Sequence, residues 1–270
     1  MRAQDVPTAV PDGRAEVPKI RVSAARKTFR QKNGAEVEAI SDLSFAVADG
    51  EYVAIVGPTG AGKSVLLDCL LGLKTLDAGR IEIDGQEVDH YIRSRKGRIT
   101  RIFQEDRLLP WLSATDNAAL GLQIQGMPEK ERRERAAYWL DAVGLSRFRN
   151  AFPSELSGGM RQRVNIARAF APNPEIILLD EAFSALDEIT AARLRGDFRD
   201  LAHRQKMTYV IVTHSIEEAI FLGSRILVFG VPARLVREVV VPAGASQDRA
   251  VVDRIRDEIR ASIAGAGRRD

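Results

Sequence analysis

The chain has 270 residues, of which 45% are hydrophobic, 29% charged and 6% aromatic, close to an average globular protein, so collagen-like, wholly disordered and disulfide-scaffold proteins are excluded. Forty basic against 37 acidic residues leave a formal net charge of +3, too small an excess to indicate a nucleic-acid-binding protein. The single cysteine, Cys69, cannot form an internal disulfide, which indicates a reducing compartment.

Short strands dominate the first part of the chain. Residues 1–18 are rich in Pro, Ala and charge and predict a disordered tail. After them, short runs rich in β-branched and aromatic residues predict strands at Ile20–Val22, Leu43–Val47 and Tyr52–Val56. The dipeptide Asp49-Gly50 predicts a tight turn before the third of these strands.

A helix and a hairpin are predicted next. Residues 64–71 are apolar nearly all round and predict a buried helix that ends at Gly72, so that Cys69 packs in the core. The run Ile81–Ile83 with the turn Asp84-Gly85 predicts a hairpin at the edge of a sheet.

The rest of the chain alternates helices and strands. A polar helix is predicted over residues 128–143, and a last helix with one apolar face over residues 246–264. Further strands are predicted at Ile176–Leu179, Tyr209–Val212 and Ile226–Phe229. Strands that alternate with helices predict an α/β fold with a parallel sheet and crossover helices.

The strongest local motif is the glycine-rich loop of residues 57–64, which matches G-x-x-x-x-G-K-[ST]. Its glycines let backbone N–H groups point inward at phosphate oxygens in a conformation that a Cβ would obstruct. Lys63 is expected to contact the β- and γ-phosphates, and the Ser64 hydroxyl is expected to ligate Mg²⁺. Because a predicted strand precedes the loop and a predicted helix follows it, we interpret it as a nucleoside triphosphate site. The residues expected around the nucleotide here are Gly57, Pro58, Thr59, Gly60, Ala61, Gly62, Lys63, Ser64 and Val65.

Two acids follow the strand predicted at Ile176–Leu179. A carboxylate at the C-terminal edge of a parallel strand beside a phosphate loop is placed to hold Mg²⁺, which is the role expected for Asp180. Glu181 is expected to accept a hydrogen bond from the attacking water. Alone, two acids here are more typical of a solvated strand end, but the phosphate loop upstream favours the catalytic interpretation.

Residues 156–163 resemble the signature motif of ATP-binding cassette (ABC) proteins, with Ser157 lying 23 residues (180 − 157) before Asp180. Ser157 and the N–H groups of Gly158 and Gly159 open a helix, which is an anion-binding arrangement. The resemblance implies that this motif closes over ATP bound to a second subunit, so that two cassettes enclose two nucleotides head to tail.

Other landmarks of the family follow its order along the chain. Gln104 matches the glutamine loop, which contacts Mg²⁺ and the attacking water and communicates with a membrane partner. Residues 184–187 match the loop that contacts the opposite subunit, which places Asp187 beside the nucleotide. His214 matches the switch histidine that hydrogen-bonds the γ-phosphate, and Phe29 lies where the family stacks an aromatic ring on adenine. The resemblance therefore implies catalytic roles for Lys63, Gln104, Glu181 and His214, and Mg²⁺ ligation by Ser64, Gln104 and Asp180.

Residues 103–111 resemble the glutamine loop of cassettes that energise nitrate, sulfonate and taurine importers, and Met160 fits the same branch. The apolar residues Leu108, Leu109 and Trp111 suit a groove that receives the coupling helix of a permease. Alternatively, they pack internally against the helical insert.

The resemblance implies an α/β fold: a RecA-like P-loop NTPase core with a parallel sheet, an antiparallel β edge and an inserted helical subdomain at about residues 105–162. It divides the chain into a tail (1–18), an ABC ATPase domain (19–235) and a C-terminal tail (236–270). Within this pattern Val65 stands where many cassettes carry a second hydroxyl, and Ser215 stands where Asp is usual after the histidine.

The activity implied is ATP hydrolysis with Mg²⁺ by a head-to-tail dimer, on the cytoplasmic face of the inner membrane. The implied partners are a second cassette, an integral permease and, indirectly, an extracytoplasmic solute-binding protein. Alternatives are a cassette of an exporter or lipid-handling transporter, and a soluble ABC ATPase. No nucleic-acid partner is expected, because a basic run without interleaved aromatics is typical of a solvated edge. That run comprises Arg93, Arg95, Lys96, Arg98 and Arg101.

Overall fold

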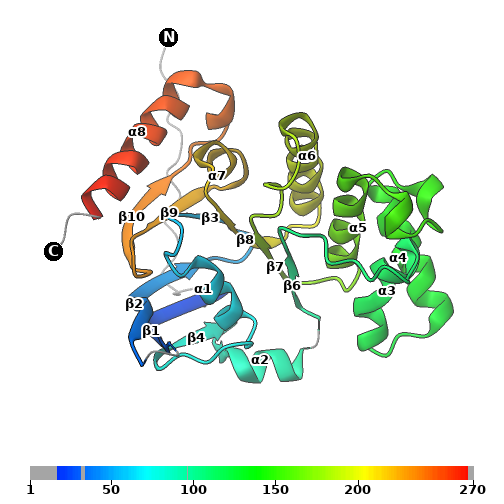
Figure 1. The fold of residues 1–270 in the computed structure, drawn as a ribbon, viewed down its shortest axis with the longest axis horizontal. Helices are drawn as coiled ribbons and strands as arrows, with labels where there is room; N and C mark the ends of the chain where they lie inside the picture. The colour runs from blue at the N-terminus through cyan, green and yellow to red at the C-terminus, as the bar shows by residue number, and fades with distance from the viewer. Residues whose placement is uncertain (1–16, 32–33, 96, 267–270) are drawn as a thin grey trace, which may run out of the picture.

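The computed structural model describes residues 17–31, 34–95 and 97–266, so nearly all of the predicted N-terminal tail lies outside the described residues. Within them the chain forms a six-stranded sheet of order β10-β9-β3-β8-β7-β6 and a four-stranded antiparallel sheet of order β2-β1-β4-β5 (Figure 1). The strands are β1 Ile20–Arg30, β2 Glu36–Val47, β3 Tyr52–Val56, β4 Ala78–Ile83, β5 Gln86–Glu87, β6 Ile99–Ile102, β7 Ile176–Asp180, β8 Thr208–Thr213, β9 Arg225–Phe229 and β10 Leu235–Val240.

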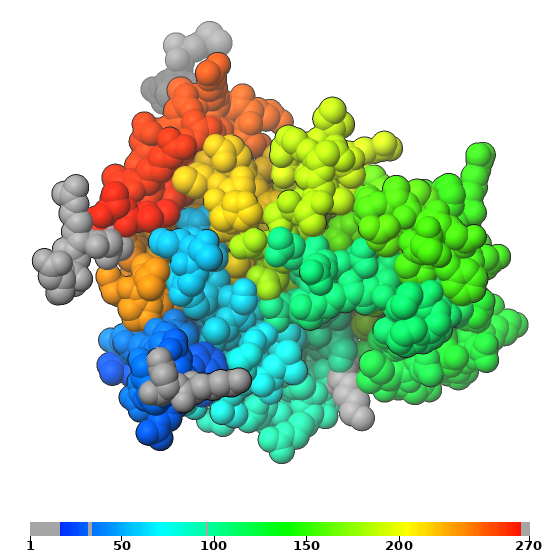
Figure 2. Space-filling view, viewed as in Figure 1, coloured from blue at the N-terminus to red at the C-terminus, as the bar shows by residue number. Residues whose placement is uncertain are grey.

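The larger sheet is parallel from β9 to β6, and β10 runs antiparallel to β9 at one edge. Helices cover its faces, and α3, α4 and α5 form the green lobe at the right of Figures 1 and 2. This confirms the predicted α/β class with a parallel core and antiparallel strands. The helices are α1 Lys63–Leu70, α2 Val88–Ser94, α3 Ala114–Ile124, α4 Glu129–Ala142, α5 Gly158–Phe170, α6 Glu188–Arg204, α7 Ile216–Leu222 and α8 Arg249–Ala266.

Side-chain alternation along β3 divides the core in two. Val53 and Ile55 point into a cluster shared by α1 and the four-stranded sheet, whereas Ala54 and Val56 point into the cluster under the other helices. Because successive strand residues face opposite sides, a parallel sheet with helices on both faces needs this continuous apolar run. Cys69 lies in the first cluster, 1% exposed, as predicted for a packing residue.

The turn at Asp49-Gly50 joins two sheets and not two hairpin partners, since β2 lies in the four-stranded sheet and β3 in the six-stranded one. Two strands were not predicted from the sequence. β6 is only four residues long and contains the charged Arg101, and β10 extends the sheet to Val240, beyond the domain boundary expected at 235. Antiparallel pairing with β9 explains why residues 236–240 form a strand and not a tail.

The C-terminal helix α8 packs on β9, β10 and α7, as its apolar face predicted. Ile255 and Ile259 are buried, and Arg237 and Arg256 form ion pairs with Glu258 (2.7 Å) and Glu217 (2.9 Å). The helix begins at Arg249, later than the predicted 246, because residues 245–247 form a 3-10 turn and the Asp248 carboxylate accepts hydrogen bonds from the N–H groups of Ala250 and Val251.

Replacing Ile259 with Ala should lower the free energy of unfolding by about 2–5 kcal/mol, the cost of a large-to-small change at a closely packed site. Ile259 is 0% exposed. Urea denaturation followed by circular dichroism measures the change. Ile263→Ala, at a partly buried position on the same face, should cost less. A loss below about 1 kcal/mol at Ile259 would contradict docking of α8 in solution.

Candidate active site

The functional residues gather where parallel strands end. β3 ends at Val56 and continues into the glycine-rich loop, β7 ends at Asp180, and β8 ends one residue before His214. Val56 pairs with Thr213 and Asp180 pairs with Val212, so these three ends lie level at one edge of the sheet. In open α/β sheets, ligands bind at this carboxyl edge.

The glycine-rich loop adopts a conformation that glycine makes possible. Gly60 and Gly62 have φ of 80° and 72°, and Gly62 is the N-cap of α1. A Cβ on Gly62 would lie 2.1 Å from the Ala39 carbonyl oxygen, which leaves no room for a side chain. The loop therefore delivers the N-terminus of a helix, with its partial positive charge, to the edge of the sheet.

Lys63 is the cation of this loop. Its Nζ donates hydrogen bonds to the carbonyl oxygens of Gly57 and Pro58, both at 2.8 Å, and the residue is 7% exposed. Burial lowers the pKa of Lys63, and the charges of Glu181 and Asp180 act in the opposite direction. The ammonium group is thus held at the loop, beside two carboxylates.

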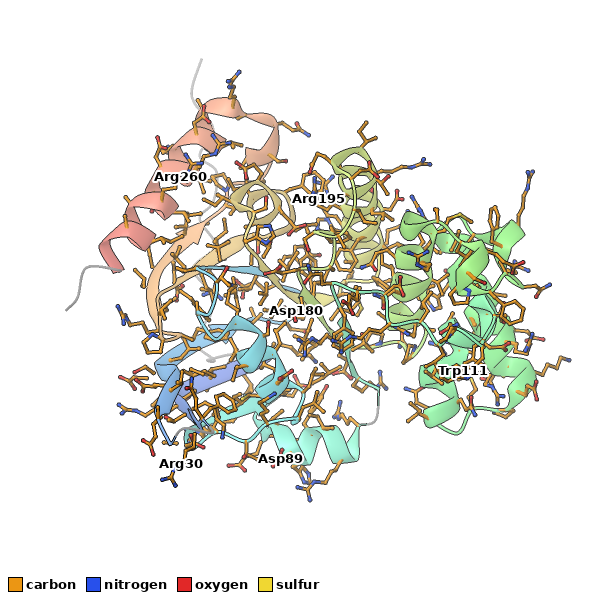
Figure 3. The ribbon with its side chains drawn as sticks, in the orientation of Figure 1. Arg30, Asp89, Trp111, Asp180, Arg195 and Arg260 are labelled. Atoms are coloured by element: carbon orange, nitrogen blue, oxygen red, sulfur yellow. The ribbon has the colours of Figure 1, made fainter. Side chains whose placement is uncertain are left out.

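Ser64 and Asp180 meet across the site. The Ser64 hydroxyl donates a hydrogen bond to Asp180 Oδ1 at 3.1 Å, which joins the start of α1 to the end of β7. A hydroxyl oxygen next to a carboxylate oxygen is a donor set that Mg²⁺ prefers. Asp180 lies near the centre of Figure 3.

Glu181 and His214 form a second pair, with 3.4 Å between His214 Nδ1 and Glu181 Oε2. Glu181 has φ of 48°, a left-handed conformation that a side chain disfavours, and its N–H donates to the Val212 carbonyl. Such strain occurs mainly where a functional side chain must be aimed in a particular direction. His214 remains 62% exposed, so its ring is open to a ligand.

Helix α5 ties the flanking loops together. Gln162 Nε2 donates to the Ala182 carbonyl at 2.5 Å and to the Phe103 carbonyl at 3.4 Å. These carbonyls belong to the residue after Glu181 and the residue before Gln104. Through these contacts one side chain of α5 joins the two loops that carry Glu181 and Gln104.

The signature residues do not lie beside their own phosphate loop. Ser157 caps α5, with its hydroxyl accepting from the Met160 N–H at 3.3 Å, and α5 and α1 lie on opposite sides of β6 and β7 in Figure 1. Asp187 caps α6 in the same way, accepting from the Thr190 N–H at 3.0 Å, which lowers its pKa. A Cβ on Gly159 would lie 2.8 Å from Thr190 Cγ2, so these two helix starts pack together.

Gln104 and Phe29 lie at the margins of the site. Gln104 follows β6 and is exposed. Phe29 is half-buried in β1, pairs with Val37 of β2, and has Lys27 Nζ 5.5 Å from its ring centroid. Ala39, farther along β2, touches the glycine-rich loop. The ring therefore lies on the strand pair that borders the loop.

Comparison with known proteins agrees with this arrangement. A family model described as "ABC transporter" matches residues 40–184, more than half of the chain. The chain belongs to the ABC transporter family. Membership of this family makes it an ATPase, as the resemblance implied.

Similar proteins include importer subunits. A taurine import ATP-binding protein, TauB of Rhizobium johnstonii, is 43% identical over 80% of this chain and 82% of its own length. A nitrate import ATP-binding protein, NrtD of Synechocystis, is 39% identical over 82% of both chains. These names agree with the nitrate, sulfonate and taurine branch predicted from residues 103–111.

The fold is also similar to a solved ABC cassette. A dimeric structure of the cassette MJ0796 in a post-hydrolysis state, bound to ADP and Pi, is 34% identical and superposes with a TM-score of 0.74. The match covers 83% of this chain and 99% of that one. The identity is high enough to compare the arrangement of elements as well as the fold class.

The residues of this ABC ATPase fit a nucleotide with Mg²⁺. Gly60 and Gly62 give the loop its left-handed backbone, the Lys63 ammonium is held at the loop, and the Ser64 hydroxyl and Asp180 carboxylate offer oxygen atoms as ligands. Val65, where a second hydroxyl is common, lies in α1 and packs partly buried against the core. Ser215 caps α7, accepting from the Glu218 N–H at 3.1 Å, which gives it a structural role.

The basic run is not a uniform solvated edge, and this prediction is wrong for Arg101. Its side chain is 9% exposed and forms ion pairs with Asp68 and Asp180, because β6 places it between α1 and β7. Arg93 and Arg95 are exposed as expected, and Arg98 is half-buried. Arg93 pairs with Asp89, whereas Arg95 and Arg98 pair with Glu175. Lys96 lies outside the described residues. No local signal was available, because neither strand β6 nor the burial of its residues was predicted from the sequence.

A buried carboxylate beneath His214 was also missed. Glu218 in α7 is 5% exposed and lies 3.8 Å from Arg195 (labelled in Figure 3). Burial raises the pKa of Glu218, while Thr213, Arg195 and His214 act against this rise. An acid at i+4 from His214 on a short helix was the signal for it.

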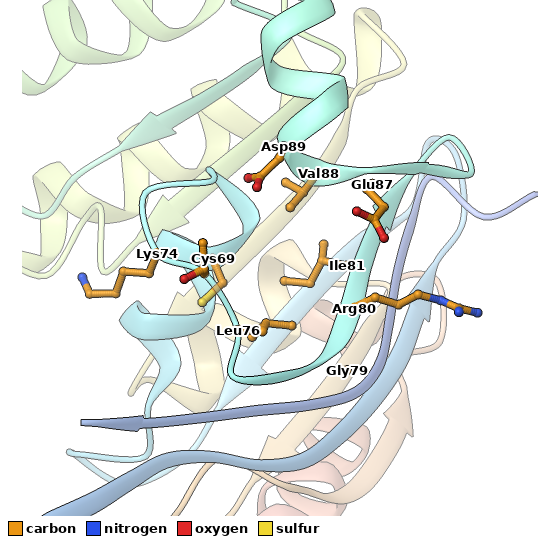
Figure 4. A pocket seen from close by; sticks show the side chains of 10 residues that line it. Cys69, Lys74, Leu76, Gly79, Arg80, Ile81, Glu87, Val88 and Asp89 are labelled. Carbon is orange, nitrogen blue, oxygen red and sulfur yellow. The ribbon is translucent and has the colours of Figure 1, made fainter. Parts of the chain in front are cut away.

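A surface pocket lies away from this site. It is lined by residues between the end of α1, β4 and the start of α2, among them Leu76, Ile81 and Val88 (Figure 4). Cys69 also borders it, and burial raises the pKa of this thiol to about 11, so it stays protonated and inert. In the described part of the chain, no helix is long and apolar enough to cross a membrane.

Proposed function

We propose that this ABC ATPase energises a membrane permease that imports a small anion of the nitrate, sulfonate or taurine type. Two copies bind two ATP molecules head to tail, on the cytoplasmic face of the inner membrane, and an extracytoplasmic binding protein delivers the solute to the permease. The likeness to the taurine and nitrate import subunits supports the importer assignment and the class of solute.

The separation of two anion-binding elements is the observation that supports the head-to-tail dimer. Lys63, Ser64, Asp180, Glu181 and His214 assemble at one strand edge, whereas the start of α5 lies across the sheet from α1. A helix N-terminus that does not serve its own loop is free to bind the phosphates of a partner's nucleotide. The dimeric form of the similar cassette MJ0796 supports the same arrangement.

The proposed division of roles follows the contacts. Glu181, paired with His214, holds and polarises the attacking water, and His214 contacts the terminal phosphate. Ser64, Asp180 and, from the glutamine loop, Gln104 hold Mg²⁺. When bound, that ion neutralises charge on the phosphates during transfer. Lys63 exchanges its hydrogen bonds with the loop carbonyls for contacts with the phosphates, and Phe29 stacks on the base. Asp187 and the residues Ser157–Gly159 complete the nucleotide site of the partner cassette.

The helical lobe offers a contact surface for the permease. Trp111 is 69% exposed, which fits a contact with the permease. Leu108 is buried in the core and Leu109 is half-buried, which fits internal packing. Asn117 holds the loop rigid: it accepts from the Leu109 N–H at 2.8 Å and donates to the Leu112 carbonyl at 3.0 Å. Trp111 lies far from Asp180 in Figure 3. A rigidly presented aromatic is a typical interface anchor.

Mass spectrometry of proteins that co-purify with a tagged copy from detergent-solubilised native membranes tests the proposal. A polytopic permease is expected, and a binding protein retained with it could be titrated with nitrate, sulfonates and taurine. Ribosomal or DNA-repair partners without any membrane protein would overturn the transport assignment and leave the ATPase activity intact.

Trp111→Ala should abolish co-purification of the permease and leave the ATPase activity of the isolated cassette unchanged, because the side chain is exposed and far from the nucleotide site. Tyr138→Ala is the matched control, since Tyr138 on α4 is another aromatic with 60% exposure. Retention of the permease by the Trp111 variant would exclude this surface as the contact.

A further inference from the structure

One buried cation in the site has no role in the proposed function. Arg101, in the short strand β6, is 9% exposed, and its guanidinium bridges two other elements. Nη1 donates to Asp68 Oδ1 of α1 at 2.6 Å, and Nη2 donates to Asp180 Oδ2 of β7. The arginine thus connects the helix that follows the phosphate loop to the carboxylate proposed to hold Mg²⁺.

Both oxygens of Asp180 are occupied by the protein itself. Oδ1 accepts from the Ser64 hydroxyl and Oδ2 accepts from Arg101. A carboxylate held at both oxygens cannot rotate freely, and its partner at Oδ2 carries a full positive charge at every physiological pH. Arg101 therefore sets both the orientation of Asp180 and the net charge beside it.

The same guanidinium touches the start of the glutamine loop. It lies 4.7 Å from the ring centroid of Phe103, and Arg107 lies 4.1 Å from the same ring. Gln104 is the next residue in the chain. Asp180 and the segment leading to Gln104, two parts of the proposed Mg²⁺ site, therefore share one buried contact.

A purely structural ion pair explains these contacts less well. Replacing a buried ion pair by apolar residues often leaves stability unchanged or raises it. Moreover, Arg101 Nε has no hydrogen-bond partner among the residues that the structure describes, which adds to the cost of burying this side chain. A costly cation in contact with a proposed metal ligand points to a role in the site.

We propose that Arg101 is a positioning residue that orients Asp180 and, through its charge, weakens the hold of the site on a divalent cation. This inference rests on the role proposed for Asp180. A positive charge in contact with a ligand carboxylate reduces its attraction for a cation, and the forked hydrogen bonds to two acids fix its direction. The cation is therefore bound in a defined place and less tightly than Asp180 alone would allow.

The test uses Mn²⁺ as the probe, measured by electron paramagnetic resonance on the purified protein with a non-hydrolysable ATP analogue. Arg101→Met should tighten Mn²⁺ binding on the order of tenfold and lower the rate of ATP hydrolysis at saturating Mg²⁺. Arg101→Lys keeps the charge but not the fork, so Mn²⁺ affinity should stay close to wild type while hydrolysis still falls. Unchanged or weaker Mn²⁺ binding by Arg101→Met would overturn the inference.

Two further variants sharpen the result. Asp68→Asn removes a negative charge and leaves Asp180 as the remaining acid in contact with Arg101. The positive charge of Arg101 is then less compensated, so Mn²⁺ binding should weaken, whereas Arg101→Met should tighten it. Tighter binding by Asp68→Asn would contradict the charge argument, and this variant keeps the test valid if Arg101→Met fails to fold. Arg98→Met is the matched control, since Arg98 pairs with Glu175 and should leave Mn²⁺ binding and hydrolysis unchanged.

Asp180→Asn separates this inference from the function on which it rests. Loss of nucleotide-dependent Mn²⁺ binding in Asp180→Asn supports the proposed role of Asp180. If that loss occurs while Arg101→Met binds Mn²⁺ like wild type, the inference about Arg101 alone fails. If Asp180→Asn binds Mn²⁺ normally, the role of Asp180 itself is refuted.

Discussion

Glu181→Gln should lower the rate of ATP hydrolysis on the order of 10²- to 10⁴-fold, the usual contribution of a general base. The amide keeps the size of the side chain near His214 but no longer accepts a proton from water. Because ATP binding does not need that proton transfer, the variant should accumulate as a closed, ATP-bound dimer. Phosphate release measures the rate, and size-exclusion chromatography with ATP measures the dimer.

A matched change elsewhere shows whether the effect is specific. Glu134→Gln, on the exposed face of α4, removes the same charge without touching the strand edge and should hydrolyse ATP like wild type. Hydrolysis by Glu181→Gln at the wild-type rate would rule out Glu181 as the base. A hydrolysis defect without an ATP-dependent dimer would still support Glu181 as the base but would count against the head-to-tail dimer.

Lys63→Ala should weaken ATP binding by roughly 10- to 150-fold, since a hydrogen bond between charged groups is worth about 1.5–3 kcal/mol. The alanine variant keeps the loop glycines but loses the ammonium now hydrogen-bonded to Gly57 and Pro58. Titration with a fluorescent ATP analogue measures the dissociation constant. Unchanged affinity would count against the whole phosphate site.

The melting temperature of the same variant separates an effect on ATP binding from an effect on folding. Burial lowers the pKa of Lys63, so the folded protein disfavours the charged form that predominates at neutral pH. Truncation relieves that penalty but also removes the hydrogen bonds to the Gly57 and Pro58 carbonyls, so the melting temperature without nucleotide should change little. Lys130→Ala, at an exposed position on α4, is the control for charge and should leave ATP affinity unchanged.

Much of the site was predictable because its motifs are local. The loop of residues 57–64 needs glycines, a lysine and a hydroxyl at set positions, and those demands hold whatever surrounds them. The strand before Asp180 was visible as an apolar run, and the acid at its C-terminal end was expected beside the phosphate loop. The hydrogen bond from Ser64 to Asp180 agrees with that expectation.

Other features were not predictable from local patterns. Arg101 looked like one of several surface cations, yet pairing of β6 with β7 buries it against Asp180. Leu108 and Trp111 are equally apolar neighbours in one loop, and packing of the helical lobe buries the first and exposes the second. In both cases burial depends on elements distant in the sequence.

The amino-acid sequence by itself determined the phosphate loop, the acids after β7 and the alternation of helices with parallel strands, because these follow from short-range spacing and backbone sterics. Only the tertiary structure decided which charges are buried and which anion-binding helix lies near which loop. Those properties arise when β6 and α5, separated from α1 by long stretches of chain, pack around the sheet and exclude water from some side chains and not from others.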